Sequence, residues 1–372
     1  MSWEKQLEDN ISKIDELLSF IDVNEDEIET LEDICNTHPL RVSRYYLSLI
    51  DKNDMSDPIR KIAIPIVHEH YLEGSYDTSG ERANTVFQGL QHKYQQTAVI
   101  LATNECAMYC RHCFRKRLVG LDTDETLRDL GRAVEYIRNH REINNVLITG
   151  GDPLILPNER IEGFLKAFTE IEHLDFIRFG TRVPVTFPQR ITEDRELLGM
   201  LSDYSDRKRI YFVTQYNHPK EITDESYDAI QGISKAGITI SNQTVLLKDV
   251  NDSPDVMVKL QRSLVEIGVV PYYIFQCRPV KRVKKHFQVP LYDGCKIMNK
   301  TRALLDGHSK RFRFIMSHPT GKIEILGIHN EQFLFRYHQA KDLKDYGRFF
   351  SRRVSKTATW LDEMENHPTL SM

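Results

Sequence analysis

The sequence lacks any apolar run long enough to cross a membrane, because no stretch approaches the roughly 18 residues that a membrane helix requires. It also lacks a strong excess of either charge: 50 Lys and Arg residues oppose 54 Asp and Glu residues, and the formal net charge is -4. This balance gives no overall electrostatic case for binding nucleic acid or an acidic membrane. The chain does not start with a basic segment followed by an apolar run, so we do not expect a signal peptide. We therefore expect a cytoplasmic protein with neither a nucleic-acid nor a membrane partner.

Cysteine is scarce, with six residues in 372, and half of the cysteines lie close together. Cys106, Cys110 and Cys113 form the pattern C-x3-C-x2-C. Thiols stay reduced in the cytoplasm, so this group indicates a metal site and not disulfides. Zinc with His112 as fourth ligand is one alternative, but His112 lies between two of the cysteines, which would strain a tetrahedral site. Three thiolates suit a 4Fe-4S cluster better, because its fourth iron stays open for a substrate or cofactor.

Short apolar runs alternate with amphipathic segments from about residue 95 to 305, which predicts an α/β fold. The runs are nearly continuous, as expected when both faces of a parallel sheet are covered. Six such units fit either a doubly wound sheet or an incomplete (βα)6 barrel. The predicted strands cover 97–103, 144–149, 175–180, 209–215, 238–247 and 269–276, and the predicted helices lie near 124–139, 158–170, 190–204, 221–236 and 254–266.

The segments on either side are interpreted as extensions of this domain, which we assign to residues 91–310. Residues 1–90 repeat apolar residues at three- and four-residue spacing, which predicts a helical extension. Residues 311–372 are expected to form a hairpin that turns at "HPTG", followed by a helical tail used for packing or oligomer contacts.

Polar motifs follow four consecutive predicted strands: "TNEC", "TGGDP", "GTRVP" and "QYNHP". Both candidate architectures bind ligands at the carboxyl ends of their strands. The four motifs together therefore predict a ligand site at that end of the sheet, whereas each motif alone would indicate only a turn.

The chain resembles two nested protein groups in these motifs. The cysteine loop after the first strand resembles that of the radical S-adenosylmethionine (radical SAM) superfamily, and several motifs in the same order resemble the lysine 2,3-aminomutase family. The resemblance covers roughly residues 55 to 325 and implies a radical SAM partial (βα)6 barrel. The motifs that carry it are "HKYQQTAVILATNECAMYCRHCFRKRLVG", "LITGGDPL", "GTRVPVTFPQRIT", "YNHPKEIT", "NQTVLLKDVNDSP" and "VPYYIFQC".

This resemblance implies an isomerase: a radical SAM aminomutase that moves an α-amino group to the β-carbon by means of a 5′-deoxyadenosyl radical. The three cysteines would hold the 4Fe-4S cluster, its open iron would bind S-adenosylmethionine (SAM), and a donor such as flavodoxin or ferredoxin would supply the electron. Pyridoxal 5′-phosphate would bind the substrate amine, and a homo-oligomer is expected. The SAM-binding residues implied by the resemblance are Tyr109, Gly150, Gly151, Asp152 and Gln243.

The resemblance also assigns residues to pyridoxal phosphate and to the substrate carboxylate. Lys322, in "HPTGK", would form the resting aldimine, although taken alone it would be an exposed turn lysine. Arg115 would bind the α-carboxylate of the substrate through two hydrogen bonds; the alternative is a solvated basic loop. The family has two arginines for the cofactor phosphate, where this chain has Lys93 and Thr97, so the phosphate site is poorer in cations.

Two further departures bear on the substrate. Arg278 and Ser317 stand where lysine-specific members have aspartates. A lysine side chain facing Arg278 without either carboxylate would be repelled and left unpaired. The substrate would therefore be lysine or, judging from Arg278, an acidic amino acid such as glutamate or aspartate. The alternative is that Arg278 turns outward with the basic cluster at 281–285.

Zinc is not expected. Some family members link their subunits through a zinc site, but Ser253 stands where they supply a cysteine, and no cysteine follows residue 325.

Two other functions stay open from the sequence. The cation-poor phosphate site also fits a radical SAM enzyme of another reaction type that does not use pyridoxal phosphate, or one that modifies a lysine on a partner protein. A non-catalytic iron–sulfur or zinc-binding module is the other possibility, but it leaves the strand-end motifs unexplained.

Overall fold

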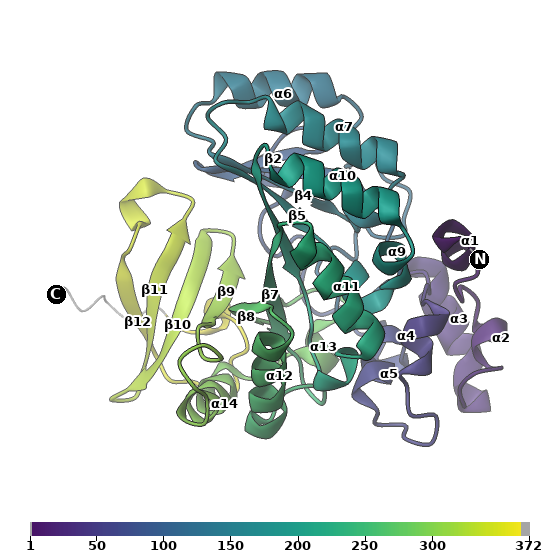
Figure 1. Cartoon of the computed structure of the whole chain (residues 1–372). Coiled ribbons are helices and arrows are strands. Elements are labelled where there is room, and N and C mark those ends of the chain that lie inside the picture. Colours follow the sequence, from purple (N-terminus) through teal and green to yellow (C-terminus); the bar gives the residue numbers. More distant parts are fainter. Residues whose placement is uncertain (1, 366–372) are drawn as a thin grey trace.

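The computed structural model describes residues 2–365, in which twelve strands form one sheet (Figure 1). The strands are hydrogen-bonded in chain order from β1 to β12. Strands β3 to β9 pair in parallel, and antiparallel pairs extend the sheet at both ends. The parallel part is β3 (Thr97–Thr103), β4 (Asn145–Gly150), β5 (Phe176–Gly180), β6 (Arg209–Thr214), β7 (Thr239–Leu246), β8 (Val270–Gln276) and β9 (Arg313–His318); the flanking strands are β1 (Thr85–Phe87), β2 (Leu90–Tyr94), β10 (Gly321–His329), β11 (Gln332–Ala340) and β12 (Phe349–Arg353).

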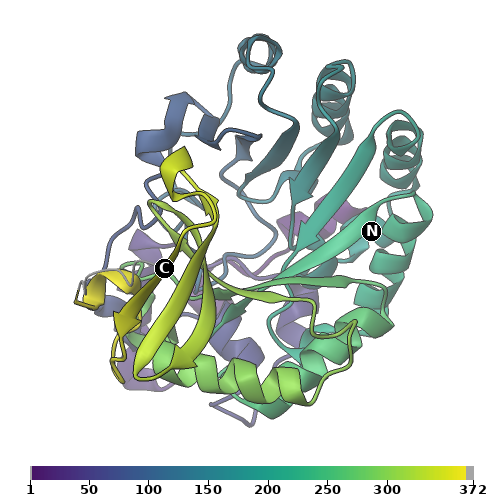
Figure 2. The same cartoon turned by 90° about the vertical axis from the view of Figure 1, so that its left-hand side faces the viewer.

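The six predicted strands are confirmed as β3 to β8, each within one residue at either end. Their apolar side chains face both the helices outside and the interior of the curved sheet, which is why the runs are continuous in sequence. The sheet is an open, partial barrel and not a doubly wound layer: Figure 2 shows it curving, with helices along its outer side.

The helices that follow these strands are confirmed in place, but those predicted from 124 and 221 begin at Leu130 and Asp224, and the one predicted at 190–204 is divided. Asp129 caps α6 and Asp194 caps α10, each with its carboxylate accepting a backbone N–H from the first turn. The predicted helix at 190–204 is consequently two helices that break just before Asp194. The outer helices are α6 (Leu130–Asn139), α7 (Asn158–Thr169), α8 (Val183–Thr186), α9 (Gln189–Thr192), α10 (Arg195–Ser205), α11 (Asp224–Lys235), α12 (Pro254–Glu266), α13 (Lys284–Phe287) and α14 (Leu291–Ala303).

The N-terminal extension is helical, as predicted, up to Ala63, and an irregular segment with two 3-10 turns leads from there to the first strand. It packs beside the cysteine loop, far from the C-terminal strands in Figure 1. Strands β1 and β2 already begin before residue 91, so the extension and the sheet overlap at that boundary. Its helices are α1 (Trp3–Glu8), α2 (Ile14–Leu17), α3 (Ile28–Thr37), α4 (Arg44–Ser48) and α5 (Pro58–Ala63).

The C-terminal hairpin at "HPTG" is confirmed as β9 and β10, but the helical tail is wrong. The segment "FFSRR" pairs with β11 as strand β12, and the rest of the tail up to residue 365 contains only short 3-10 turns. Pairing prevails because β10 occupies only one side of β11, so the backbone N–H and C=O groups on its other side are open to another strand. Residues 366–372 of the predicted tail lie outside the described part of the chain.

Side chains join strand β2, near one end of the sheet, to strands β9 and β10 across the opening of the curve. The Lys93 ammonium on β2 donates to the carbonyl of His318 at the end of β9, with an Nζ to O distance of 2.7 Å. The Lys322 ammonium on β10 lies 5.6 Å from the ring centre of Tyr94 on β2. Strands β2 and β9 share no backbone ladder. We call these side-chain contacts between β2 and β9–β10 the seam.

Among residues 2–365, no helix is both long and apolar enough to span a membrane.

Candidate active site

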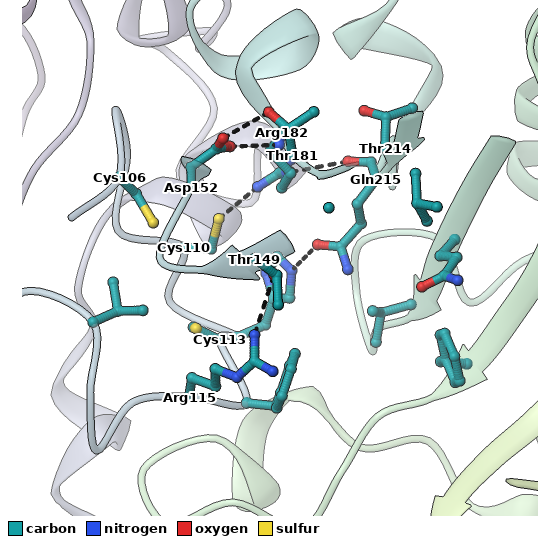
Figure 3. Close-up of a pocket in the computed structure, with 18 of the residues that line it drawn as sticks. Cys106, Cys110, Cys113, Arg115, Thr149, Asp152, Thr181, Arg182, Thr214 and Gln215 are labelled. Carbon is teal, nitrogen blue, oxygen red and sulfur yellow. Dashed lines mark hydrogen bonds between the residues drawn. The ribbon is translucent and has the colours of Figure 1, made fainter. Parts of the chain in front are cut away.

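A cavity of about 290 Å³ lies at the carboxyl ends of β4 to β8, beside the cysteine loop (Figure 3). It brings together residues that are up to 216 positions apart in the sequence, from Cys106 to Lys322. Tyr109 and Lys93 do not line it. The predicted site residues that line the cavity are Cys106, Cys110, Cys113, Arg115, Gly150, Gly151, Asp152, Gln243, Arg278, Ser317 and Lys322.

The three cysteine thiols surround one part of this cavity, as Figure 3 shows. Their loop is fixed from behind by the N-terminal extension, because the N–H groups of Tyr109 and Arg111 donate to carbonyls of Arg41 and Ile62. Burial raises the pKa of the Cys113 thiol to about 11. Such a thiol ionises when a metal replaces its proton, so the burial of Cys113 is compatible with a metal-binding role.

Arg182, which sequence reasoning missed, places a cation beside the thiols. Its Nη1 donates to the Sγ of Cys110 and its Nε donates to the carbonyl of Gln215 at 2.9 Å. Its Nη2 pairs at 2.5 Å with Glu221, a carboxylate with no solvent exposure that also accepts from the Tyr46 hydroxyl at 2.6 Å. The motif "GTRVP" could have identified Arg182, because it places an arginine just after the end of a strand. The ion pair keeps the guanidinium turned toward Cys110.

The two glycines of "TGGDP" allow β4 to end tightly against the cysteine loop. Gly150 has φ +124°, which side chains disfavour. A Cβ atom added to Gly151 would lie 2.1 Å from the carbonyl oxygen of Glu105. Both residues are therefore needed for the close approach of the strand end to the loop that carries the thiols.

The Asp152 carboxylate is already engaged within the protein. It accepts from the Thr181 hydroxyl at 2.7 Å and from the N–H of Arg182 at 2.6 Å, as drawn in Figure 3. It also accepts from the N–H of Leu154 at 3.1 Å. A role of Asp152 toward SAM stays a prediction, and any such contact would be additional to these three.

Tyr109 lies outside the cavity. Its ring packs on Gly120, where an added Cβ would come within 2.7 Å of it, and its hydroxyl donates to Glu105 at 2.5 Å. Glu105 in turn pairs with Arg41. Through these contacts Tyr109 helps to hold the cysteine loop in position. Its contact with SAM stays a prediction.

Arg115 lines the cavity with one side of its guanidinium only. The other side is occupied by Glu81, which accepts from Nη2 at 2.9 Å and from Nε at 3.1 Å. Glu81 also pairs with Arg117 at 2.8 Å. Although burial opposes its ionisation, these two arginines hold the pKa of Glu81 at about 2. A carboxylate ligand would therefore meet Arg115 at Nη1, which now lies 3.3 Å from the Thr149 hydroxyl.

Arg278 points into the cavity, so the alternative in which it turns outward is wrong. Its guanidinium donates to the hydroxyls of Ser79 at 2.9 Å and Ser317 at 3.0 Å, and it lies 3.9 Å from the ring centre of Phe114. No carboxylate forms an ion pair with it among residues 2–365. Burial lowers its pKa to about 10, so it stays charged at neutral pH.

Lys322 is a partly buried amine in the wall of the cavity. Its Nζ lies 5.6 Å from the ring centre of Tyr94 and 5.3 Å from that of Tyr273. Burial, followed by the nearby charges of Arg178 and Lys93, lowers its pKa to about 7. A large fraction of the amine is therefore unprotonated and nucleophilic near neutral pH.

A smaller cavity of about 130 Å³ adjoins the first at Lys322 and is lined by Lys93. The Lys93 ammonium donates to the carbonyls of Ser79 at 3.1 Å and His318 at 2.7 Å, and burial lowers its pKa to about 7. The amide Nε2 of Gln91, in the wall of the same cavity, is buried without a hydrogen-bond partner. A donor without a partner next to an amine suits an anionic ligand group such as a phosphate.

Comparison with known proteins agrees with this geometry. Residues 100–260 match the sequence profile of the Radical SAM superfamily. A relative from Aquifex aeolicus, provisionally named an L-lysine 2,3-aminomutase, is 42% identical over 93% of each chain. The L-lysine 2,3-aminomutase of Clostridium subterminale is 38% identical over 82% of this chain and 73% of its own. The glutamate 2,3-aminomutase of Clostridioides difficile is also 38% identical, over 82% of this chain and 72% of its own.

The chain belongs to the lysine 2,3-aminomutase family of radical SAM enzymes.

Solved structures are less similar to this member of the family. A radical SAM methyltransferase from Sphaerobacter thermophilus matches 61% of this chain and 68% of its own, with 18% identity and a TM-score of 0.38. A similarity this low gives no information about function.

Membership in the aminomutase family implies a 4Fe-4S cluster and SAM, and the residues of the cavity fit both. Cys106, Cys110 and Cys113 line the cavity and would supply three thiolate ligands, which would leave one iron of the cluster free. Gln243 and the glycines of "TGGDP" line the cavity beside them. Of the residues that sequence reasoning missed, Arg182 donates to Cys110, Glu81 pairs with Arg115, and Glu221 holds Arg182 in place.

Proposed function

We propose that this enzyme is a pyridoxal phosphate-dependent 2,3-aminomutase that acts on an acidic amino acid, with glutamate as the best candidate. The observation that carries the proposal is Arg278: a half-buried guanidinium that lines the cavity, donates to the hydroxyls of Ser79 and Ser317, and forms no ion pair with a carboxylate among residues 2–365. A buried cation without an anion is stabilised by an anionic ligand. The similarity to a glutamate 2,3-aminomutase supports the same choice.

Three arginines line the cavity, and two of them, Arg115 and Arg278, lie close to one aromatic ring. Phe114 has the Arg278 guanidinium 3.9 Å from its ring centre and the Arg115 guanidinium 4.8 Å from it. A substrate with two carboxylates would bridge them, with its α-carboxylate at Nη1 of Arg115 and its side-chain carboxylate at Arg278. Lysine would place an ammonium against Arg278 instead, which costs free energy in a buried site.

The cysteine end of the cavity would generate the radical. When bound, the cluster would supply the electron that cleaves SAM to methionine and a 5′-deoxyadenosyl radical, which would abstract a substrate hydrogen. Cys106, Cys110 and Cys113 would hold the cluster, and Arg182 would keep a positive charge at the Cys110 sulfur. The cavity is walled by Gly150, Gly151 and Gln243, where SAM would lie.

The lysine end of the cavity would hold pyridoxal phosphate, which when bound supplies the imine through which the amino group migrates. Lys322 is the amine that would attach to it, since its pKa of about 7 leaves it nucleophilic. Lys93 and the Gln91 amide would face the phosphate, which compensates in part for the two missing family arginines.

The test is an anaerobic turnover screen of the reconstituted enzyme with glutamate, aspartate, lysine and ornithine, scored for 5′-deoxyadenosine and for β-amino acid product. We expect product from glutamate, with aspartate next. Lysine as the best substrate would refute the role of Arg278. Cleavage of SAM without any β-amino acid would favour a radical reaction of another type.

A second measurement tests the cofactor. The absorbance of bound pyridoxal phosphate should disappear in Lys322→Ala and persist in Lys310→Ala, whose residue is exposed. An unchanged spectrum in Lys322→Ala would contradict the assignment.

A further inference from the structure

Two segments form a basic face on the outside of the molecule. Residues 68–72, which include part of the 3-10 helix η2 (Val67–His70), lie against residues 281–285 at the start of α13. The N–H of Arg282 donates to the carbonyl of Tyr71 at 3.0 Å, and the Arg282 guanidinium donates to the carbonyl of Glu69 at 3.1 Å. We call residues 68–72 and 281–285 the basic face.

The positive charge of this face is not neutralised by its own neighbours. Lys281, Arg282 and Lys285 form no ion pair among residues 2–365, whereas Lys284 pairs with Glu73 and Glu363. The carboxylate of Glu69 is turned inward and has no solvent exposure. Since the whole chain carries a formal charge of -4, the basic face is a local feature and not a consequence of overall composition.

Two exposed apolar residues lie within the basic face. Tyr71 is 49% exposed and Leu72 is 54% exposed, and the Lys285 ammonium lies 5.5 Å from the ring centre of Tyr71. Apolar residues inside a charged surround are typical of transient protein–protein contacts, where charge governs the encounter and the apolar centre is buried.

The basic face is connected to the cysteine loop through one buried carboxylate. Glu69 accepts from the Arg111 guanidinium at 2.7 Å and from the Lys116 ammonium at 2.7 Å. Arg111 follows Cys110 directly, and Lys116 lies three residues after Cys113. The thiol-bearing loop is therefore the next layer of protein beneath the basic face.

We propose that the basic face is the docking site of an acidic electron carrier of the flavodoxin type. This inference rests on the proposed function, because the cluster needs one electron before SAM is cleaved. In that transfer the anionic flavin hydroquinone loses one electron and becomes the neutral semiquinone, the cluster is reduced by one electron, and no proton moves. Such carriers have strongly negative surfaces around their flavin, and charge complementarity with the basic face raises the rate of encounter.

The experiment uses the full chain with its cluster reconstituted, mixed anaerobically with a recombinant bacterial flavodoxin reduced to the hydroquinone. Semiquinone absorbance reports the second-order rate constant. We expect the double variant Lys281→Glu/Lys285→Glu to lower this constant by about tenfold or more at about 50 mM salt, and the wild-type constant to fall as salt rises. The matched control is Lys300→Glu/Lys310→Glu, which changes the charge equally at exposed lysines elsewhere.

Reduction by dithionite separates this inference from the proposed function. Dithionite is small and needs no docking site, so the spectrum of the reduced cluster should be the same in the wild type and in both double variants. If dithionite reduces no cluster in the wild type, the proposed function fails. If dithionite works but the basic-face variant reacts with flavodoxin as fast as the control, the docking site is refuted.

Binding of a short fluorescent RNA duplex provides the last comparison. RNA binding that is lost in Lys281→Glu/Lys285→Glu, with an unchanged flavodoxin rate, would assign the basic face to nucleic acid and overturn the proposal. Equal thermal unfolding midpoints for the two double variants would show that both are folded.

Discussion

At the level of single residues, the chemistry of this site depends on amines and guanidiniums that are shielded from water. Lys322 has its pKa lowered to about 7, mainly by burial, because a charged ammonium loses solvation there. Its reactive form is the neutral amine, so its reactivity rises as pH increases through that pKa. A lysine exposed to solvent would reach the same state only near pH 10.

The first prediction concerns this amine. The neutral fraction of Lys322 rises from about one tenth at pH 6 to about nine tenths at pH 8 if its pKa is about 7. The rate of pyridoxal phosphate attachment should therefore rise by nearly tenfold over that range and then level off. Stopped-flow absorbance of the full chain would measure it, with Lys322→Ala as the blank. A rate that keeps rising up to pH 10 would contradict the lowered pKa.

The second prediction concerns substrate choice. The double variant Arg278→Asp/Ser317→Asp should lower kcat/KM for glutamate by about 30-fold or more, because it replaces the cation that meets the side-chain carboxylate. It should raise kcat/KM for lysine, whose ammonium then faces two carboxylates. Product analysis with each amino acid would measure both. Arg311→Asp, at an exposed position, should leave the ratio unchanged, and a double variant that still prefers glutamate would argue against the role of Arg278.

Residues with a local motif could be predicted from the sequence, and those defined by a distant partner could not. The cysteines, Lys322 and Arg278 each stand in a short recognisable motif, and all of them line the cavity. Arg182 meets Cys110 across 72 residues, a pairing set by how two strand ends meet. The ion pair between Arg115 and Glu81 was also not predictable, because Glu81 lies in an irregular segment before β1.

At the scale of elements, strand ends decide the geometry of the cavity. The turn after β4 passes so close to the cysteine loop that the N–H of Gly151 donates to the carbonyl of Thr103 at 2.6 Å and that of Asp152 donates to Glu105 at 2.7 Å. These bonds hold the predicted SAM side of the cavity and the predicted cluster side in fixed relation.

The third prediction tests this turn. Gly151→Ala should weaken SAM binding by about tenfold or more, because its new Cβ would lie 2.1 Å from a backbone oxygen and must push the loop away. Equilibrium dialysis of labelled SAM against the reconstituted enzyme would measure it. The control is Gly163→Ala in α7, where nothing lies within 4 Å of the added Cβ and SAM binding should not change. Equal SAM binding by both variants would mean that the tight turn is dispensable.

Elements with a regular pattern were predicted well, and elements defined by capping or pairing were not. Buried parallel strands have continuous apolar sequences with polar ends, so β3 to β8 could be located within a residue. The start of α10 depends on one carboxylate, that of Asp194, which separates it from α9. Strand β12 forms because β11 offers it an edge, and no periodicity within "FFSRR" distinguishes a strand from a helix.

At the scale of the whole molecule, two buried carboxylates link separate parts of the chain. Glu69 joins the N-terminal extension to the cysteine loop, and Glu81 joins the segment before β1 to the same loop. Burial alone would raise their pKa values, but the surrounding cations outweigh it and hold the pKa of each at about 2. Both groups are therefore ionised throughout the physiological range.

The fourth prediction is a steep loss of stability in acid. Because the folded pKa values lie below the usual carboxyl value of about 4.5, the stabilisation is present above pH 4.5 and is lost as pH falls toward 2. The loss should be on the order of 2 kcal/mol or more for each group. Urea unfolding between pH 6 and pH 3 would measure it. Glu81→Gln should flatten this dependence and Glu172→Gln, at an exposed position, should not; equal slopes for the two variants would contradict the assignment.

Because of the seam between β2 and β9–β10, the wall of the cavity could open without exposing strand amides to hydrogen exchange, which is not possible in a closed barrel. In a closed barrel, widening the wall means breaking a backbone ladder, and the amides involved lose their protection from hydrogen exchange. Here β2 keeps both of its neighbouring strands and so does β9, while only side-chain contacts such as Lys93 to His318 join them. Parting the seam for ligand traffic therefore breaks no hydrogen bond of the strand ladders, so we expect the exchange rates of the paired amides of β2 and β9 not to report the opening of the cavity.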